Sequence, residues 1–403
     1  MSDFYQTGVV TTLHRLGPPN AERLERELVR LVRERPLALV LPSLYSELEG
    51  PALPHIVDEL CKVPYISQIV ISLDRADKKQ FHHAREFFSQ LPQVHRIIWN
   101  DGPRLRSLFE LLPKHDLNFG EQGKGRGAWV AHGYVLAQGQ ARVIAIHDCD
   151  ILTYDREMLG RLVYPVVNRQ LNYRFCKGFY SRVTDRMHGR VTRLMMTPLI
   201  RSLQRTVGPL PFLTYLDSFR YILAGEFSMD ADLPRVNRIP SDWGLEIGVL
   251  AEVYRNVALQ RVCQVDIASN YEHKHQPLSE QDPEHGLMKM AVDISKSLFQ
   301  TLAGEGVILS AGLFKSLEAS YKRTAEDTIE RYHADAAING LEFDRDNEEK
   351  AVETFTRSIG LAGESFLADP LGAPLIPNWN RVTSAIPGFL SSLSEAVDED
   401  NKS

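Results

Sequence analysis

The chain has 403 residues, of which 43% are hydrophobic and 24% charged, and its formal net charge is −6 at pH 7. This composition is typical of a globular protein with two domains or one large domain and an extension. The acidic balance gives no reason to expect a nucleic-acid or membrane surface, so an anionic substrate would need local positive charge.

Cysteine usage and the N-terminal sequence indicate the compartment. Four scattered cysteines form no C-x-x-C pair, which argues against a zinc site and a disulfide framework. No apolar run approaches the roughly 18 to 20 residues of a membrane-spanning helix, and the first residues lack a signal-peptide layout. We therefore expect reduced thiols and a cytoplasmic protein.

The first hundred residues alternate predicted helices and strands. A charged amphipathic helix over 20–35 ends at Pro36, and a buried strand follows over 37–42. The next elements are a helix over 52–61, a strand over 66–73 that ends at Asp74, a helix over 78–90 and a strand over 94–99. This succession of βαβ units predicts a parallel sheet.

A glycine-rich stretch over 120–127 precedes an apolar helix predicted over 128–137. Glycines let the backbone approach a ligand, and Lys124 adds a mobile ammonium near a partly positive helix N-terminus. The stretch suits a diphosphate or a uracil edge, although it has neither Walker nor G-x-G-x-x-G spacing. A simple connecting loop is the alternative.

The next strand ends in two carboxylates. Residues 143–146 are apolar, and Asp148 and Asp150 follow one residue apart. In an open α/β sheet the ligand site lies beyond the carboxyl ends of the strands, where a D-x-D can hold a divalent metal bound to phosphates. The pattern suggests metal-assisted departure of a nucleoside diphosphate from a sugar. An ordinary turn or helix cap is the alternative.

Two later patterns carry polar groups. Asp242 and Glu246 lie at the start of a predicted helix, where they could cap it or accept hydrogen bonds from sugar hydroxyls. His273 and His275 would share one side of an extended segment, as metal ligands or as solvated side chains. From about residue 288 the chain is predicted to be helical, with a solvated tail over 397–403.

Nine short motifs occur in one order between about residues 37 and 278, and together they carry a resemblance. They are Leu41-Pro42-Ser43-Leu44, Asp74, Gly123-Lys124-Gly125, Asp148-Cys149-Asp150, Lys177-Gly178-Phe179-Tyr180, Gly189-Arg190-Val191-Thr192, Ala224-Gly225-Glu226, Gly244-Leu245-Glu246-Ile247-Gly248 and Glu272-His273-Lys274-His275-Gln276-Pro277-Leu278. The chain resembles the glucosyl-3-phosphoglycerate synthases, which are retaining glycosyltransferases related to the mannosyl-3-phosphoglycerate synthases.

The resemblance implies an α/β fold of the GT-A type, with a mostly parallel sheet and a helical C-terminal extension. The domains implied are an N-terminal helical segment (1–36), a glycosyltransferase domain (37–287), a helical extension (288–396) and the tail. Within the glycosyltransferase domain, residues 37–152 would bind the nucleotide sugar and residues 153–287 the acceptor. Family members are typically homodimers.

The resemblance also assigns roles to single residues. The donor nucleotide would be bordered by Pro42, Ser43, Leu44, Asp74, Lys124 and Asp148. Asp150 and His273 would bind Mg²⁺ or Mn²⁺, and Glu246, with Gly225 and its neighbours, would hold the hexose. The acceptor would be held by Gly189, Arg190, Thr192 and His275, with Arg190 as a bidentate fork. Asp150, Glu246 and Arg190 would be the catalytic residues.

Two departures from the family pattern leave the substrates open. Tyr45-Ser46-Glu47 stands where the family reads Asn-Glu-Glu, so the donor base is not fixed. His275 and Gln276 replace an Asn and an Arg beside the acceptor, so recognition of its phosphate is not fixed either.

The function predicted is metal-dependent transfer of glucose, with retention, from a nucleoside-diphosphate glucose to 3-phosphoglycerate. The donor would be UDP-glucose or a GDP-linked hexose. Alternatives are a mannosyl donor, unphosphorylated glycerate as the acceptor, a nucleotidyltransferase, or a sugar-nucleotide-binding scaffold without catalysis. No nucleic-acid or membrane partner is expected.

Overall fold

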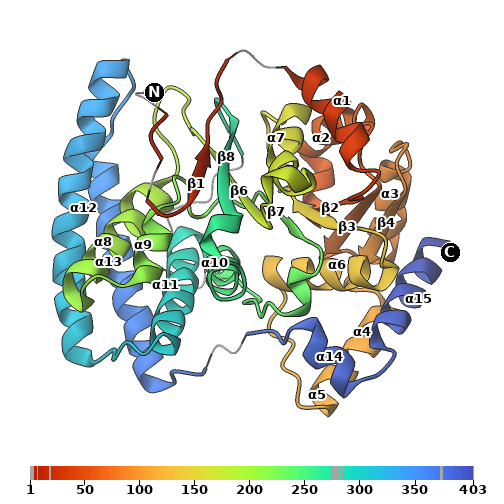
Figure 1. Cartoon of the computed structure of the whole chain (residues 1–403). Coiled ribbons are helices and arrows are strands. Elements are labelled where there is room, and N and C mark those ends of the chain that lie inside the picture. Colours follow the sequence, from red (N-terminus) through yellow and green to blue (C-terminus); the bar gives the residue numbers. More distant parts are fainter. Residues whose placement is uncertain are drawn as a thin grey trace.

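The computed structural model describes residues 4–6, 8–17, 20–273, 282, 285–372 and 375–402. These residues form one central sheet of eight strands in the order β1-β8-β6-β7-β5-β2-β3-β4 (Figure 1). The strands are β1 (Thr11–Leu13), β2 (Leu37–Leu44), β3 (Gln68–Asp74), β4 (His95–Trp99), β5 (Val143–Ile146), β6 (Phe175–Tyr180), β7 (Phe227–Asp230) and β8 (Val262–Ala268).

The sheet is mostly parallel, as predicted. Strand β7 alone among the described strands runs antiparallel to its neighbours β5 and β6. Strand β3 is buried along its whole length, which fits a parallel strand covered on both faces. Side chains of β2 alternate between the two faces: Ala38 and Val40 join one hydrophobic core, and Leu39 and Leu41 join the other.

Helices of the first half cover both faces. Their bounds are α1 (Ala21–Leu31), α2 (Ala52–Cys61), α3 (Lys78–Phe88), α4 (Pro103–Phe109), α5 (Leu111–Lys114), α6 (Lys124–Gln138) and α7 (Arg156–Val167). The core between the sheet and α1, α2, α3 and α7 is separate from the core that contains α6. Helix α6 begins at Lys124, four residues earlier than predicted, so part of the glycine-rich stretch lies in its first turn.

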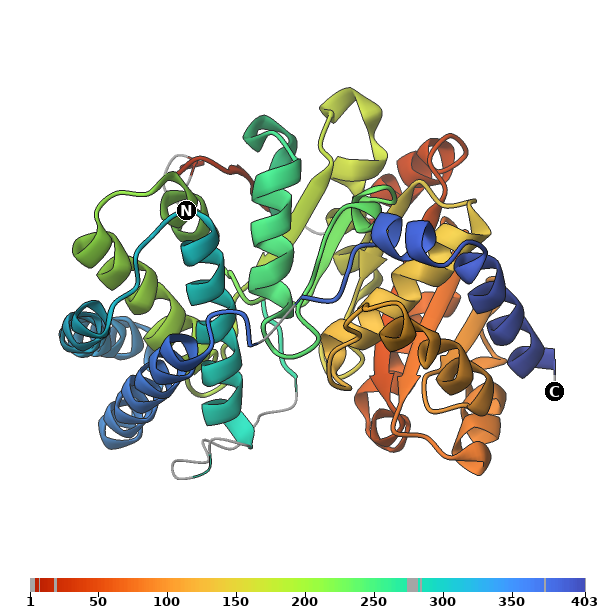
Figure 2. The same cartoon turned by 90° about the horizontal axis from the view of Figure 1, so that it is seen from below.

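The second half adds further helices, of which α11, α12 and α13 are the longest (Figure 2). These helices are α8 (Thr197–Val207), α9 (Pro211–Asp217), α10 (Leu245–Asn256), α11 (Gly286–Gly304), α12 (Ala311–Asn339), α13 (Arg345–Ala368), α14 (Trp379–Ala385) and α15 (Phe389–Lys402). A π-helix, η3 (Val191–Met196), leads into α8, and short 3₁₀ turns are η1 (Tyr45–Glu49), η2 (Arg169–Leu171), η4 (Leu233–Arg235) and η5 (Leu259–Arg261). Helices α12 and α13 pack against α8 and α11, so the C-terminal helical region predicted from the sequence is present.

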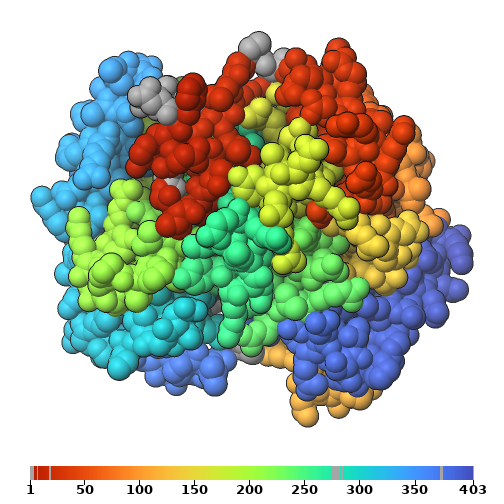
Figure 3. Space-filling view, viewed as in Figure 1, coloured from red at the N-terminus to blue at the C-terminus, as the bar shows by residue number. Residues whose placement is uncertain are grey.

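The last two helices, α14 and α15, lie on the opposite side of the sheet order from α12 and α13, beside α4 and α6 (Figures 1 and 3, lower right). The indole of Trp379 on α14 stacks on Trp129 of α6 with ring centroids 3.9 Å apart. The solvated tail predicted over 397–403 was wrong, because residues 397–402 belong to α15 and Val397 is fully buried. The sequence signal failed since charged residues on one helix face hid the apolar residues on the other.

The N-terminal segment also differs from the prediction. Besides α1, it contains β1, which joins the sheet beside β8 in parallel register. A three-residue strand carries too little pattern to be recognised from sequence. Within the described part of the chain, no helix is both long and apolar enough to cross a membrane.

Candidate active site

The carboxyl ends of parallel strands bring the predicted donor-binding residues to one edge of the sheet. Strand β2 ends with Pro42, Ser43 and Leu44, and Leu44 lies in register with Asp74 at the end of β3. Strand β5 pairs with β2 only as far as Ile146, opposite Val40, so the chain leaves the sheet at the D-x-D. The sheet therefore gathers side chains that are more than 100 positions apart.

Lys124 links two predicted site carboxylates. Its Nζ lies 2.8 Å from Asp148 Oδ1 and 3.0 Å from Glu246 Oε1. Burial alone would lower the pKa of the Lys124 ammonium, but the two carboxylates hold that pKa well above its ordinary value. Helix α6 thus presents a permanent positive charge at its N-terminus, where the backbone N–H groups already favour an anion.

Gly225 lies against this ion pair. A Cβ at this position would lie 2.7 Å from Lys124 Nζ and would overlap with Asp148 Oδ2. Any larger residue would therefore displace the ion pair, which explains the glycine in the Ala224-Gly225-Glu226 motif.

Asp150 and His273 meet at the same edge. Asp150 Oδ2 lies 3.4 Å from His273 Nδ1, and Ile151 forms an antiparallel bridge with His273. Burial would raise the pKa of Asp150, but His273 holds it below the ordinary value. The proximity that the predicted metal site requires is therefore present.

The donor set fits a divalent cation shared with a substrate. Two ligands of an octahedral Mg²⁺ at about 2.1 Å lie about 3 Å apart, so a 3.4 Å separation needs only a small adjustment. Among the residues that the structure describes, no group of three or more His, Cys, Asp and Glu side chains converges on one point. Further ligands would therefore come from diphosphate oxygens and water, the usual arrangement for Mg²⁺.

A buried polar cluster lies beside this edge. Tyr180 and Tyr271 stack with centroids 3.8 Å apart, and their hydroxyls donate to the two oxygens of Glu226 at 3.0 and 2.7 Å. Lys177 Nζ donates to the Ala224 carbonyl at 2.6 Å, and burial lowers the pKa of Lys177 to about 8. Glu226 was expected only as a neighbour of Gly225 in the hexose site, and Lys177 was assigned no role, although a lysine inside the apolar strand β6 was a usable signal.

Asp74 and the residues before α10 complete the donor side. Gln122 donates to Asp74 Oδ1 at 2.9 Å, and burial raises the pKa of Asp74 to about 6. Asp242 accepts a hydrogen bond from the Gly244 N–H at 2.8 Å and so forms the turn that precedes α10. Asp242 and Glu246 were both considered as helix caps or sugar ligands. In the structure Asp242 shapes the turn before α10, whereas Glu246 forms an ion pair with Lys124.

The predicted acceptor residues lie in a second region. Gly189 has φ +75° and packs under the Tyr221 ring, which is 4.8 Å from the Tyr180 ring. Arg190 precedes η3, Thr192 is buried within it, and His275 lies outside the described residues. The contact through Tyr221 and Tyr180 connects the acceptor region to the metal edge.

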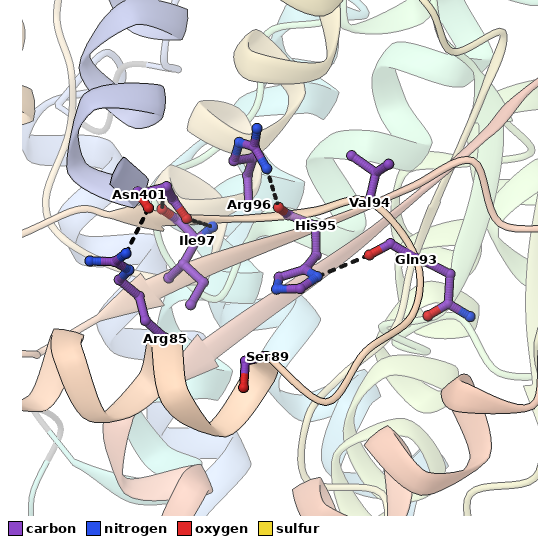
Figure 4. Close-up of a pocket in the computed structure, with 8 residues that line it drawn as sticks. All are labelled: Arg85, Ser89, Gln93, Val94, His95, Arg96, Ile97 and Asn401. Atoms are coloured by element: carbon purple, nitrogen blue, oxygen red, sulfur yellow. Dashed lines mark hydrogen bonds between the residues drawn. The ribbon is translucent and has the colours of Figure 1, made fainter. Parts of the chain in front are cut away.

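Of two pockets in the structure, one contains a predicted site residue and the other does not. A pocket of about 380 Å³ is lined by Arg190 together with Arg186, Arg193 and Glu348. Another, of about 460 Å³, lies between α3, β4 and α15 and contains none of the predicted site residues (Figure 4). It is a groove beside the last strand of the sheet.

Comparisons with known proteins decide the family. No family model matches the chain. A glucosyl-3-phosphoglycerate synthase of Persephonella marina is 46% identical over 401 residues, covering 100% of this chain and 99% of the relative. The protein of the same name from Methanococcoides burtonii is 40% identical and covers 99% of this chain and 98% of the relative. The chain belongs to the glucosyl-3-phosphoglycerate synthase family.

Solved structures of the glucosyl-3-phosphoglycerate synthase family share the fold. The Mycobacterium tuberculosis enzyme in complex with Mn²⁺, UDP-glucose and phosphoglyceric acid aligns with a TM-score of 0.52 at 19% identity, covering 73% of this chain and 88% of that one. Its complex with Mg²⁺ and UDP aligns with a TM-score of 0.50. The predicted GT-A fold is confirmed.

Proposed function

We propose that this protein transfers glucose from UDP-glucose to 3-phosphoglycerate, with retention, and forms glucosyl-3-phosphoglycerate with Mg²⁺ or Mn²⁺ as the cofactor. The observation that carries the proposal is the 3.4 Å approach of Asp150 to His273 in a chain 46% identical to a glucosyl-3-phosphoglycerate synthase. Relatives of known structure bind Mn²⁺ with UDP-glucose and phosphoglyceric acid, which favours a uridine donor over a GDP-linked hexose.

The donor side would act through charge. A divalent cation bound by Asp150 and His273 would neutralise the charge that develops on the departing diphosphate. Lys124 is placed to add a second positive charge, and Glu246, which it holds, to accept hydrogen bonds from hydroxyls of the transferred glucose. Pro42, Ser43, Leu44 and Asp74 would border the nucleoside.

The acceptor side would act by positioning. Arg190 carries a planar fork that matches a carboxylate or a phosphate, and Gly189 and Thr192 flank it. We nominate no carboxylate as a covalent nucleophile, so we infer attack by the acceptor hydroxyl on the face that the diphosphate leaves. A phosphate oxygen of the donor would take the proton, and alignment of the two substrates would supply the protein's main contribution.

The test is a substrate panel. UDP-glucose, GDP-glucose and GDP-mannose are each incubated with 3-phosphoglycerate or glycerate, and the products are identified by mass spectrometry and NMR. We expect glucosyl-3-phosphoglycerate from UDP-glucose, no turnover after chelation of the metal, and none with Asp150→Ala.

The panel also contains the results that would reject the proposal. Faster turnover of glycerate than of 3-phosphoglycerate would make the protein a glucosylglycerate synthase, and preference for GDP-mannose would make it a mannosyltransferase. Near wild-type activity of Asp150→Ala would reject the metal assignment. Sedimentation of the same preparation tests the homodimer, and fractionation of the source cells tests a cytoplasmic location.

A further inference from the structure

One carboxylate of the C-terminal helices holds the acceptor segment. Glu348 on α13 is 5% exposed and lies between Arg190 and Arg193. Arg190 donates from Nε to Glu348 Oε1 at 3.1 Å, while Arg193 donates from Nη1 to Oε2 at 2.8 Å and from Nη2 to Oε1 at 3.2 Å. A single buried carboxylate therefore pairs with two guanidinium groups, and the net charge of the three side chains is +1.

The two arginines differ in what they leave available. Arg193 also donates to the carbonyls of His188 and Met187, at 2.8 and 3.3 Å, and lies over the Tyr332 ring. Within the described part of the chain, the Nη atoms of Arg190 have no acceptor, and its side chain is 28% exposed. Arg193 is thus committed to the fold, whereas Arg190 presents its fork to the pocket of about 380 Å³.

The same helices also fix the backbone around Arg190. Tyr321 on α12 donates to the Leu194 carbonyl inside η3 at 2.7 Å. The Glu342 N–H, in the linker before α13, donates to the Asp185 carbonyl at 2.8 Å. A π-helix is a rare conformation that is frequently found at functional sites, and here α12 and the linker before α13 support it from outside.

We propose that Glu348 is a positioning residue for the acceptor, so that the C-terminal extension forms part of the acceptor site. This inference rests on the proposed function, in which Arg190 binds the carboxylate or phosphate of 3-phosphoglycerate. By accepting the Nε–H, Glu348 stops the guanidinium from rotating and aims its two Nη groups outward. A bidentate match depends on that orientation, because a displaced fork offers one hydrogen bond in place of two.

The test compares Glu348→Gln with the wild-type protein. Glutamine keeps the shape of glutamate but removes the charge that orders both arginines. We expect the KM for 3-phosphoglycerate to rise about tenfold, because the displaced Arg190 fork would lose one charge-assisted hydrogen bond to the acceptor. The KM for UDP-glucose should stay unchanged. Calorimetric titration of 3-phosphoglycerate without donor or metal should show the same loss of affinity, and Glu348→Asp should recover part of it.

The matched control is Glu349→Gln. Glu349 is the next residue on α13, is 56% exposed and pairs with Arg345 on the surface. We expect this variant to keep the wild-type KM for both substrates, since exposed ion pairs contribute little.

Arg190→Ala separates failure of this inference from failure of the proposed function. If Arg190→Ala raises the acceptor KM and Glu348→Gln does not, the inference is overturned and the acceptor assignment stands. If neither variant changes it, the acceptor assignment and the inference both fall. An equal rise in both substrates' KM with Glu348→Gln, together with a lower melting temperature, would make Glu348 merely structural and would also overturn the inference.

Discussion

At the scale of single residues, buried charges below the sheet edge keep the site in shape. Lys177 is 1% exposed and donates a hydrogen bond to the Ala224 carbonyl, and Glu226 is fully buried. Gly225, between them, lies against Lys124 and Asp148. Charges are costly to bury, so such groups persist only where each has partners. Tyr180, Tyr271 and the Ala224 carbonyl are those partners.

Replacing Lys177 by methionine should destabilise the protein by about 1–3 kcal/mol at neutral pH, because the buried Ala224 carbonyl loses its hydrogen-bond donor. Urea unfolding followed by circular dichroism measures the loss. Lys315→Met, on the exposed surface of α12, is the control and should cost less than about 0.5 kcal/mol. Equal stability of the two variants would show that the cluster does not need the ammonium.

At the scale of elements, α15 protects an edge of the sheet. Strand β4 is the last strand, and Asn401 accepts from the Ile97 N–H at 3.1 Å and donates to the Ile97 carbonyl at 2.7 Å. Arg85 donates to the Asn401 carbonyl (Figure 4). Arg96 also pairs with Asp398, so α15 is fixed beside the strand. The helix thus occupies the backbone groups of Ile97 at the edge of the sheet and hinders pairing of β4 with another molecule.

Asn401→Ala should lower the free energy of unfolding by about 1–3 kcal/mol, since both backbone groups of Ile97 lose their partner. It should also raise aggregation on mild heating, which light scattering detects. Lys402→Ala changes the next residue, whose side chain is exposed, and should neither lower the stability nor raise aggregation. The protective role of α15 would be disproved by an Asn401→Ala protein as stable as Lys402→Ala.

Helix α11 carries a carboxylate that makes stability depend on pH. Asp293 Oδ2 lies 3.2 Å from Lys289, yet burial, with the nearby Asp242, raises the pKa of Asp293 to about 6. Between an unfolded pKa near 4 and this folded value, the folded state binds a proton that the unfolded chain has released. The contribution of Asp293 to stability therefore falls as the pH rises through this window and stays low above it.

Asp293→Asn should remove this dependence. The stability of the variant relative to wild type should increase by about 2 kcal/mol between about pH 4.5 and 7.5, measured by urea unfolding at both values. Asp335→Asn, at an exposed position on α12, is measured at the same two pH values as the control. A constant difference for Asp293→Asn would mean that its carboxyl is not destabilised by burial.

At the scale of the whole molecule, the site lies where two halves of one sheet meet. Strands β2, β3 and β5 bring the donor residues, β6 and β7 lead to the supporting cluster, and the C-terminal helices brace the acceptor segment. The chain then crosses back to the donor side as α14 and α15 (Figure 2). Ligands that bridge these parts should stabilise the whole protein.

UDP-glucose with Mn²⁺ should therefore raise the free energy of unfolding by about 2.7 kcal/mol at a hundred times the dissociation constant. Thermal and urea unfolding with each ligand alone and with both together measure this linkage. Asp150→Asn should lose most of the added stabilisation that Mn²⁺ gives in the presence of UDP-glucose. An unchanged response of Asp150→Asn would place the metal elsewhere.

Local sequence patterns were enough to predict most strands of the first half and the family. Apolar runs bounded by Pro, Gly and Asp predicted β2, β3 and β4 to within two residues, and nine ordered motifs indicated the fold. These signals are local, since each depends on residues close together in the chain. The placement of Asp148 and Asp150 at a strand end was predictable for the same reason.

Which distant groups meet is visible only in the folded chain. No local pattern says that Lys124 lies between Asp148 and Glu246, that Asp150 faces His273, or that Glu348 holds Arg190. Nor could a local pattern show that the charged C-terminus packs on β4, because burial of one helix face depends on a neighbour that is 304 positions away in sequence. Such contacts depend on strand order and helix packing, which are properties of the folded chain as a whole.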